Sequence, residues 1–257
     1  MSETGTQDND TSASDTVEVH VDTDSLVAAA AAKFVDVVVA AQAARGCASV
    51  VLTGGGTGIG LLEVVRKAPG AIDWSRLDVF WGDERFVPAA DGERNDLQAR
   101  QALLDHVPVD PARVHPVAAS DGEYPDPIEA AAEYSAAVHA YLAEHGSFDL
   151  HLLGMGGEGH VNSLFPDTDA VREEHELVVA VTNSPKPPPV RVTLTVPAIR
   201  RTRHVVLVVG GAAKADAVAA AIAGADPVDI PAAGAIGLES TTWLLDQPAA
   251  SALQLPD

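Results

Sequence analysis

The hydrophobic positions of the chain fall into short continuous runs that are separated by longer segments with helical features. The apolar runs and the alternating segment VEVHV predict strands at 17–21, 48–53, 77–82, 148–154, 177–181, 204–211 and 242–245. Capping residues and Ala-rich stretches predict helices from Asp24 or Ser25 to Gly46, from the first glycine loop to about Arg66, from Asn95 to Leu104, from Asp126 to Glu144 and over 212–223. Continuous apolar strands that alternate with helices are typical of a parallel sheet covered on both faces. The pattern therefore predicts an α/β fold with a mostly parallel sheet and helices on both faces.

Three polar loops that contain glycine begin directly where predicted strands end. They cover 53–58, 82–95 and 154–163. In parallel sheets, ligands bind where loops leave the carboxyl ends of the strands. We therefore expect the three loops to converge on one rim and to form a single active site.

The charge of the chain limits its partners. Asp and Glu number 37 against 16 Lys and Arg, which gives a formal net charge of −21 among 257 residues. Such a surface repels phosphate backbones, so nucleic acid is not expected as a partner. An anionic substrate would need a local cluster of positive side chains, and each Lys or Arg in a loop becomes a candidate.

The start of the chain and the lack of a membrane-length apolar run indicate a cytoplasmic protein. The polar, acidic start predicts a disordered tail over 1–15, followed by a single domain over 16–257. The start lacks the basic and apolar regions of a secretory signal, and no segment reaches the roughly 18 uninterrupted apolar residues of a membrane helix. A single cysteine, Cys47, excludes an internal disulfide and a four-cysteine zinc site.

The first loop, TGGGTGIG (53–60), has the character of a phosphate site. Its glycines allow backbone N–H groups of Gly55, Gly56 and Thr57 to face an anion, and the helix that follows adds its positive end. A tight strand-to-helix turn without a ligand is the alternative. The string also matches the cofactor loop of short-chain dehydrogenases, but no tyrosine of the chain is followed four residues later by the lysine those enzymes need. We treat that match as accidental.

The second loop begins with Gly82, Asp83, Glu84 and Arg85. Two carboxylates and a guanidinium at a strand end can form an oriented set of charges, and Arg85 can bind a planar oxyanion through two hydrogen bonds. A solvated turn is the plain alternative. The position at the end of an apolar strand favours the functional interpretation.

The third loop, GMGGEGH (154–160), points most directly to chemistry. Four glycines within six residues lead to His160 and then to Asn162, which core packing does not explain. Glu158 is placed to orient the imidazole or to raise its basicity, and a His with a carboxylate partner can act as a general base toward water. Neither HExxH nor a pair of histidines at helical ligand spacing occurs, so we predict no metal. The mechanism that we expect from these residues uses no cofactor either.

Two further cations lie in and after a proline-rich segment, SPKPPPVRVTLT (184–195). Prolines restrict the backbone that carries Lys186, and Arg191 follows five residues later. In a protein this acidic, the two cations suggest recognition of an anion, although ordinary solubilising charge is the alternative. Lys214, which follows GGAA, is a weaker candidate.

Taken together, these motifs resemble the 6-phosphogluconolactonase family. The resemblance covers roughly 17–250 and rests on motifs that occur in order: GDERFVP (82–88) with Asn95 downstream, GMGGEGHVNSLFP (154–166), KPPPVRVTLT (186–195), GGAAKADAV (210–218) and PAAGAIG with TTWLLD (231–246). Two departures stand out. Glu158 replaces the usual Asp of the family, and TGGGTGIG stands where the family tends toward SGGSTP.

The resemblance implies the three-layer α/β architecture shared with ribose-5-phosphate isomerase A and the glucosamine-6-phosphate deaminases. It also implies hydrolysis of 6-phospho-D-glucono-1,5-lactone in the oxidative pentose phosphate pathway. A deaminase-like isomerase and a non-catalytic sugar-phosphate-binding protein are the alternatives. The segment VNSLFP (161–166) and the GDER segment favour the lactonase.

A metal-independent mechanism follows from these residues. His160, oriented by Glu158, takes a proton from the water that attacks C1, and Arg85 stabilises the charge on the carbonyl oxygen. The residues expected to bind substrate are Gly55, Gly56, Thr57, Asp83, Glu84, Asn95, Asn162, Lys186 and Arg191. Which of Lys186, Arg191, Lys214 and Arg85 holds the phosphate stays open at this point, and a monomer or weak homo-oligomer is expected.

Overall fold

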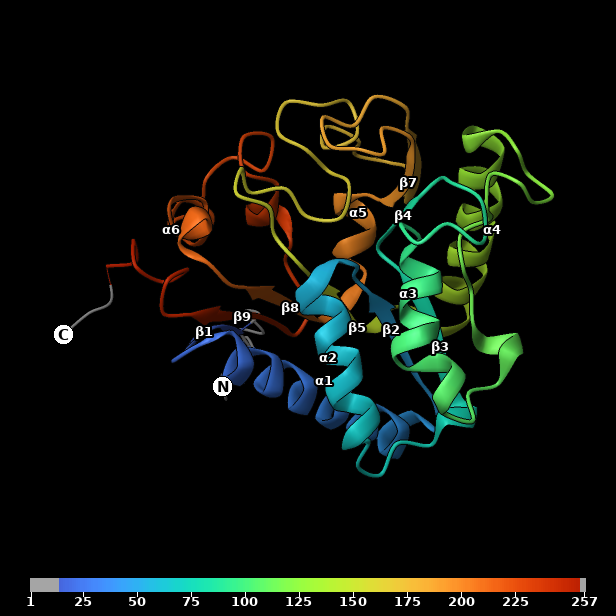
Figure 1. Cartoon of the computed structure of the whole chain (residues 1–257), viewed down its shortest axis with the longest axis horizontal. Coiled ribbons are helices and arrows are strands. Elements are labelled where there is room, and N and C mark those ends of the chain that lie inside the picture. Colours follow the sequence, from blue (N-terminus) through green and yellow to red (C-terminus); the bar gives the residue numbers. More distant parts are fainter. Residues whose placement is uncertain (1–13, 255–257) are drawn as a thin grey trace, which may run out of the picture.

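The computed structural model describes residues 14–254, which contain a six-stranded sheet and a three-stranded sheet (Figure 1). The larger sheet contains, in spatial order, β1 (Ser14–His20), β9 (Ser240–Asp246), β8 (Thr202–Val209), β5 (Phe148–Leu153), β2 (Ala48–Leu52) and β3 (Leu77–Trp81). All neighbouring strands in it are parallel, and every residue of β2, β3 and β5 is buried. The predicted parallel sheet is therefore confirmed.

Helices cover both faces of the larger sheet. One face carries α1 (Thr23–Arg45), α2 (Gly55–Lys67) and α3 (Asn95–Ala102). The other face carries α4 (Pro127–His145), α5 (Val196–Ile199) and α6 (Ala215–Ile222). Burial of apolar side chains on both faces explains why the strands are apolar throughout rather than alternating. The three-layer α/β fold is confirmed.

The smaller sheet lies beside α4 and is antiparallel, with β4 (Asp83–Arg85), β7 (Arg191–Leu194) and β6 (Val178–Val181) in that order (Figure 1). Gly82 connects the two sheets, because its N–H donates to Leu52 O (2.9 Å) and its carbonyl accepts from Leu194 N (2.8 Å). A Cβ at Gly82 would lie 2.2 Å from Asn162 Oδ1, so only glycine fits there. The apolar pattern predicted neither β4 nor β7, and these two strands bring Arg85 and Arg191 side by side.

Several element boundaries differ from the predicted ones. The acidic tail predicted over 1–15 lies outside the described residues as far as residue 13, whereas Asp15 belongs to β1 and pairs with Thr241. Helix α1 begins earlier than expected because Asp22 is its N-cap, and the Asp22 side chain accepts from the Ser25 N–H (2.8 Å). The single domain expected from residue 16 stays a prediction.

Among the helices of the described chain, α1 alone is long and apolar enough to span a membrane by length and composition. Its side chains Leu26, Phe34 and Val38 are buried and belong to the apolar core beneath the larger sheet. Packing of that face against the sheet explains why a helix of this composition occurs here.

Candidate active site

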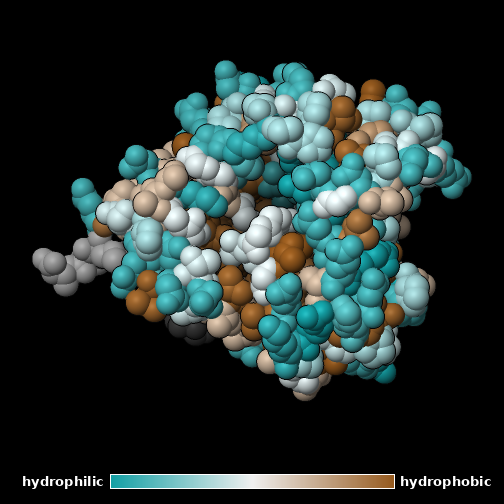
Figure 2. Space-filling model, viewed as in Figure 1, coloured by the Kyte–Doolittle hydropathy of each residue, from teal (hydrophilic) through white to brown (hydrophobic). Residues whose placement is uncertain are grey.

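A cavity of about 210 Å³ opens where the parallel strands end, near the start of α2. In Figure 2, hydrophilic residues lie above the hollow and to its right, and residues of intermediate or apolar character border it below. Its walls are formed by residues 53–58, Asp83, Arg85, Asn95, residues 154–156, His160, Asn162, Arg191, Val208 and Lys214. All three polar loops that were expected to converge therefore line one cavity. The predicted single rim is confirmed.

The wall at the start of α2 is suited to an anion. The N-cap residue, Gly54, provides no side chain to accept from the first N–H groups of the helix, so those of Gly55, Gly56 and Thr57 are available to a ligand. The positive end of the helix dipole adds to this preference for negative charge. Gly54 is required for a further reason, because a Cβ there would lie 2.0 Å from Asn95 Oδ1.

His160 and Glu158 form the pair that the third loop predicts. The Glu158 Oε1 atom lies 3.2 Å from His160 Nδ1, and the imidazole stacks on Phe165 with ring centroids 4.5 Å apart. A carboxylate at Nδ1 favours the tautomer with its proton there and leaves the Nε2 lone pair free. Burial lowers the pKa of His160 below its usual value, and the charge of Lys186 lowers it further against the opposing effects of Glu158 and Asp83. The imidazole is thus suited to accept a proton near neutral pH.

Gly156 makes room for this pair. A Cβ at Gly156 would lie 2.0 Å from His160 Nδ1 and 2.7 Å from Glu158 Oε2. Gly156→Ala should therefore displace the imidazole and lower kcat by about tenfold, within the scale known for a misplaced catalytic group. Gly92→Ala is the matched control, because a Cβ there meets no atom within 4 Å. Steady-state kinetics on the folded variants checks this, and equal kcat values for the two would contradict it.

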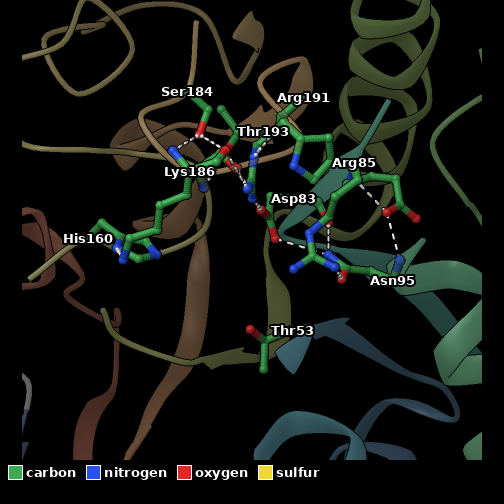
Figure 3. A network of polar contacts seen from close by, with 12 residues as sticks. Thr53, Asp83, Arg85, Asn95, His160, Ser184, Lys186, Arg191 and Thr193 are labelled. Atoms are coloured by element: carbon green, nitrogen blue, oxygen red, sulfur yellow. Dashed lines mark hydrogen bonds and ion pairs between the residues drawn. The ribbon is translucent and has the colours of Figure 1, made fainter. Parts of the chain in front are cut away.

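Asp83, Arg85 and Asn95 form a linked group on the cavity wall (Figure 3). Asp83 Oδ2 accepts from Ser163 Oγ at 2.6 Å, and Asp83 Oδ1 accepts from Asn95 Nδ2 at 3.2 Å. Asn95 Oδ1 accepts from Arg85 Nη1 at 2.9 Å, and the same Nη1 donates to the Glu93 carbonyl at 2.7 Å. The Arg85 guanidinium is therefore held by one nitrogen beside the start of α2, while its Nε has no protein partner within residues 14–254.

Glu84 does not line the cavity, and the structure places it away from the position expected of a residue that contacts substrate. Its side chain is fully buried and accepts the N–H groups of Arg85 (2.8 Å), Asn95 (2.7 Å) and Asp96 (2.8 Å). Burial raises the pKa of Glu84 to about 7, although Arg94 and these three N–H groups oppose the shift. Glu84 thus anchors the first turn of α3 to β4 and holds Asn95 in the cavity wall.

Arg191 lines the cavity, but its donors are already engaged. Its Nε and Nη2 atoms donate to the backbone carbonyls of residues 186–188 at 3.0–3.1 Å. Its Nη1 atom lies 3.4 Å from Ser163 Oγ and 3.6 Å from Asp83 Oδ2. This arrangement fixes the proline loop to β7 and leaves little capacity for a phosphate, contrary to the role expected from the sequence.

Lys186, which the sequence suggested as a ligand of the anionic substrate, is engaged with Glu158 instead. Its Nζ atom lies 2.8 Å from Glu158 Oε1 and 3.4 Å from Nδ1 of His160, so the ammonium is paired beside the base at the edge of the cavity. Lys214, the weaker candidate, does line the cavity, and burial followed by repulsion from Lys186 lowers the pKa of its ammonium. The signal for Lys214 was its position directly after the strand at 204–211, at the same rim as the three loops.

Asn162 lies on the cavity wall as expected, but its amide is buried. The residue adopts a left-handed backbone conformation with φ of 50°, and neither amide atom has a hydrogen-bond partner within residues 14–254.

Thr53 also lines the cavity, and its hydroxyl accepts from Gly154 N at 3.3 Å. Thr53 is thus a cavity residue that the loop motif alone does not single out. In residues 14–254, no group of three or more His, Cys, Asp or Glu side chains is arranged to hold a metal ion.

Comparisons with known proteins identify the family of the chain. Residues 21–243 match the family described as glucosamine-6-phosphate isomerases/6-phosphogluconolactonase. The fold is that of this class of proteins, and the chain belongs to that family. The 6-phosphogluconolactonase of Mycobacterium tuberculosis is 55% identical over 93% of this chain and 99% of its own length, and that of Streptomyces coelicolor is 54% identical over 93% and 94%.

Solved structures extend the comparison to the fold. The 6-phosphogluconolactonase from Trypanosoma cruzi superposes with a TM-score of 0.79 at 28% identity, covering 95% of this chain and 98% of that one. A monomeric glucosamine-6-phosphate deaminase superposes with a TM-score of 0.73 at 21% identity, covering 93% and 100%, which shows a shared fold alone. The lactonase branch of the family is therefore the one that the similar sequences represent.

Proposed function

We propose that the protein hydrolyses 6-phospho-D-glucono-1,5-lactone to 6-phospho-D-gluconate. The observation that carries this is the His160–Glu158 pair in a cavity whose other wall is the anion-binding start of α2. A base beside an anion site fits an electrically neutral lactone ring that bears a phosphate. The names of the most similar relatives support the same substrate.

In the proposed reaction, His160 Nε2 takes a proton from a water molecule as the water oxygen forms a bond to C1 of the lactone. The tetrahedral intermediate then collapses, and the bond between C1 and the ring oxygen breaks. The imidazolium returns its proton to that ring oxygen, which becomes the C5 hydroxyl. Glu158 keeps the imidazole in the required orientation throughout and stabilises its transient positive charge.

The phosphate lies, in this proposal, at the start of α2 between Arg85 and Lys214. Both cations line the cavity, and Arg85 is held beside α2 through Asn95. Arg85 lies across the site from His160 (Figure 3), so we assign it to the phosphate end rather than to the carbonyl oxygen that it was expected to stabilise. The cytoplasmic location, metal independence and monomer or weak homo-oligomer stay predictions.

The activity is tested by following lactone hydrolysis above its spontaneous rate. Freshly made 6-phosphogluconolactone should be consumed faster with purified protein than without it, and EDTA should not remove the difference. Formation of 6-phosphogluconate is measured by a coupled oxidation, with ammonia release from glucosamine 6-phosphate measured in parallel. Ammonia release alone would move the assignment to the deaminases, and binding without either reaction would indicate a sugar-phosphate sensor.

A further inference from the structure

Lys186 is held in a defined position by its own loop. Ser184 Oγ donates to the Lys186 carbonyl at 2.9 Å and accepts from its N–H at 3.2 Å. Arg191 Nη2 donates to the same carbonyl at 3.1 Å, so the backbone at this point is fastened to β7. The reach of the lysine side chain is thereby restricted to one side of the cavity.

The ammonium group of Lys186 lies against the base and its carboxylate. Its Nζ atom is 2.8 Å from Glu158 Oε1, 2.9 Å from Glu158 Oε2 and 3.4 Å from His160 Nδ1. In Figure 3, Lys186 and His160 lie together on one side of the site, whereas Arg85 and Asn95 lie on the other. A phosphate at the start of α2 would have Arg85 and Lys214 as neighbours in the cavity wall, while the Lys186 ammonium is paired with Glu158.

We propose that Lys186 is a positioning residue of the His160 base and not part of the phosphate site, because its ion pair holds the Glu158 carboxylate against Nδ1 of the imidazole. The inference rests on the proposed role of His160. In this proposal Lys186 supports the base that transfers the proton. Binding of the phosphate is left to the start of α2, Arg85 and Lys214.

The charges around the imidazole support this assignment. Glu158 and Asp83 favour the imidazolium form, and Lys186 opposes it. Burial acts to raise the pKa of Glu158, but hydrogen bonds from Lys186 and the backbone, with the charges of His160 and Lys186, lower it to about 2. Lys214 faces the same group and interacts with both Lys186 and Glu158. Removing the Lys186 charge therefore raises the pKa of His160, both directly and by leaving Glu158 without its cation.

The test measures the pKa of His160 by NMR titration of the labelled imidazole, assigned through His160→Gln. Lys186→Met should raise that pKa by about one unit, the scale of one nearby charge on a partly exposed side chain, and Lys186→Arg should restore most of the wild-type value. In kinetics, kcat/KM of Lys186→Met should fall about tenfold on the acid side of both pKa values. Above pH 8 it should recover only in part, because Glu158 is then no longer held against Nδ1 of the imidazole. The loss should be equal for phosphorylated and unphosphorylated gluconolactone.

The controls separate this role from phosphate binding, from a long-range effect of charge and from a general loss of stability. Lys67→Met removes the same charge from an exposed position at the end of α2 and should leave the pKa of His160 unchanged. A loss confined to the phosphorylated lactone, or an unchanged pKa of His160, would overturn the proposal, as would an equal shift in Lys67→Met. Lys186→Gln provides a second variant, and thermal unfolding excludes a general loss of stability. If the wild-type protein hydrolyses no lactone, the proposed function fails, whereas the titration still decides the contact.

Discussion

Replacing His160 with alanine is expected to lower kcat by about 10²-fold or more, the usual scale for loss of a general base. The imidazole is held by Glu158 at Nδ1 and by stacking on Phe165, so its Nε2 atom is the free base of the cavity. Binding of the lactone should suffer less than kcat, because the anion site lies on another wall. Steady-state kinetics of the purified variant, with the spontaneous rate subtracted, measures the effect.

Two variants make this result specific. Glu158→Gln should give a smaller loss of kcat than His160→Ala, because Glu158 orients the base without accepting the proton itself. His139→Ala, on the exposed side of α4, should leave kcat unchanged. Because burial lowers the pKa of His160, the wild-type kcat/KM should decline only below the usual histidine range near pH 6.5. An unchanged kcat in His160→Ala would remove this residue from the mechanism.

The larger sheet and the position of the site could be predicted because both depend on local patterns. Continuous apolar runs require strands buried on both faces, and the glycine loops that follow them must meet at one edge. The sequence also identified the partner of His160, since Glu158 is only two residues away. The predicted N-cap of α1 was wrong: Asp24 or Ser25 was expected, whereas Asp22 is the cap, because several polar residues within one turn can serve.

Long-range contacts explain why the sequence did not show which charged side chains face the cavity. Strands β4 and β7 are three and four residues long, too short for a recognisable pattern, and their pairing decides where neighbouring side chains point. Within β4, Glu84 turns inward to the start of α3, whereas Asp83 and Arg85 line the cavity. The motif placed these charges together but could not show which of them a substrate would reach.

The contacts of Lys186 and Arg191 change the prediction of which cations hold the phosphate. Lys186 and Arg191 are engaged with Glu158 and with backbone carbonyls, which leaves Arg85 and Lys214 facing the cavity near the start of α2. A protein with a net charge of −21 cannot attract a dianion by its overall field, so these local groups must do so. A hydrogen bond to a charged group contributes about 1.5–3 kcal/mol, and each 1.4 kcal/mol changes an equilibrium by a factor of about ten.

We therefore expect Arg85→Met and Lys214→Met each to lower kcat/KM for 6-phosphogluconolactone by roughly 10- to 150-fold. The loss should largely vanish with unphosphorylated gluconolactone, which offers these cations no phosphate. The comparison of each variant on both lactones works as a double-mutant cycle in which the phosphate is the second partner. Arg191→Met is the contrasting variant: because it unfastens the proline loop, its losses should be similar on the two lactones. Equal losses on both lactones for Arg85→Met and Lys214→Met would place the phosphate elsewhere and assign these two cations to the lactone ring.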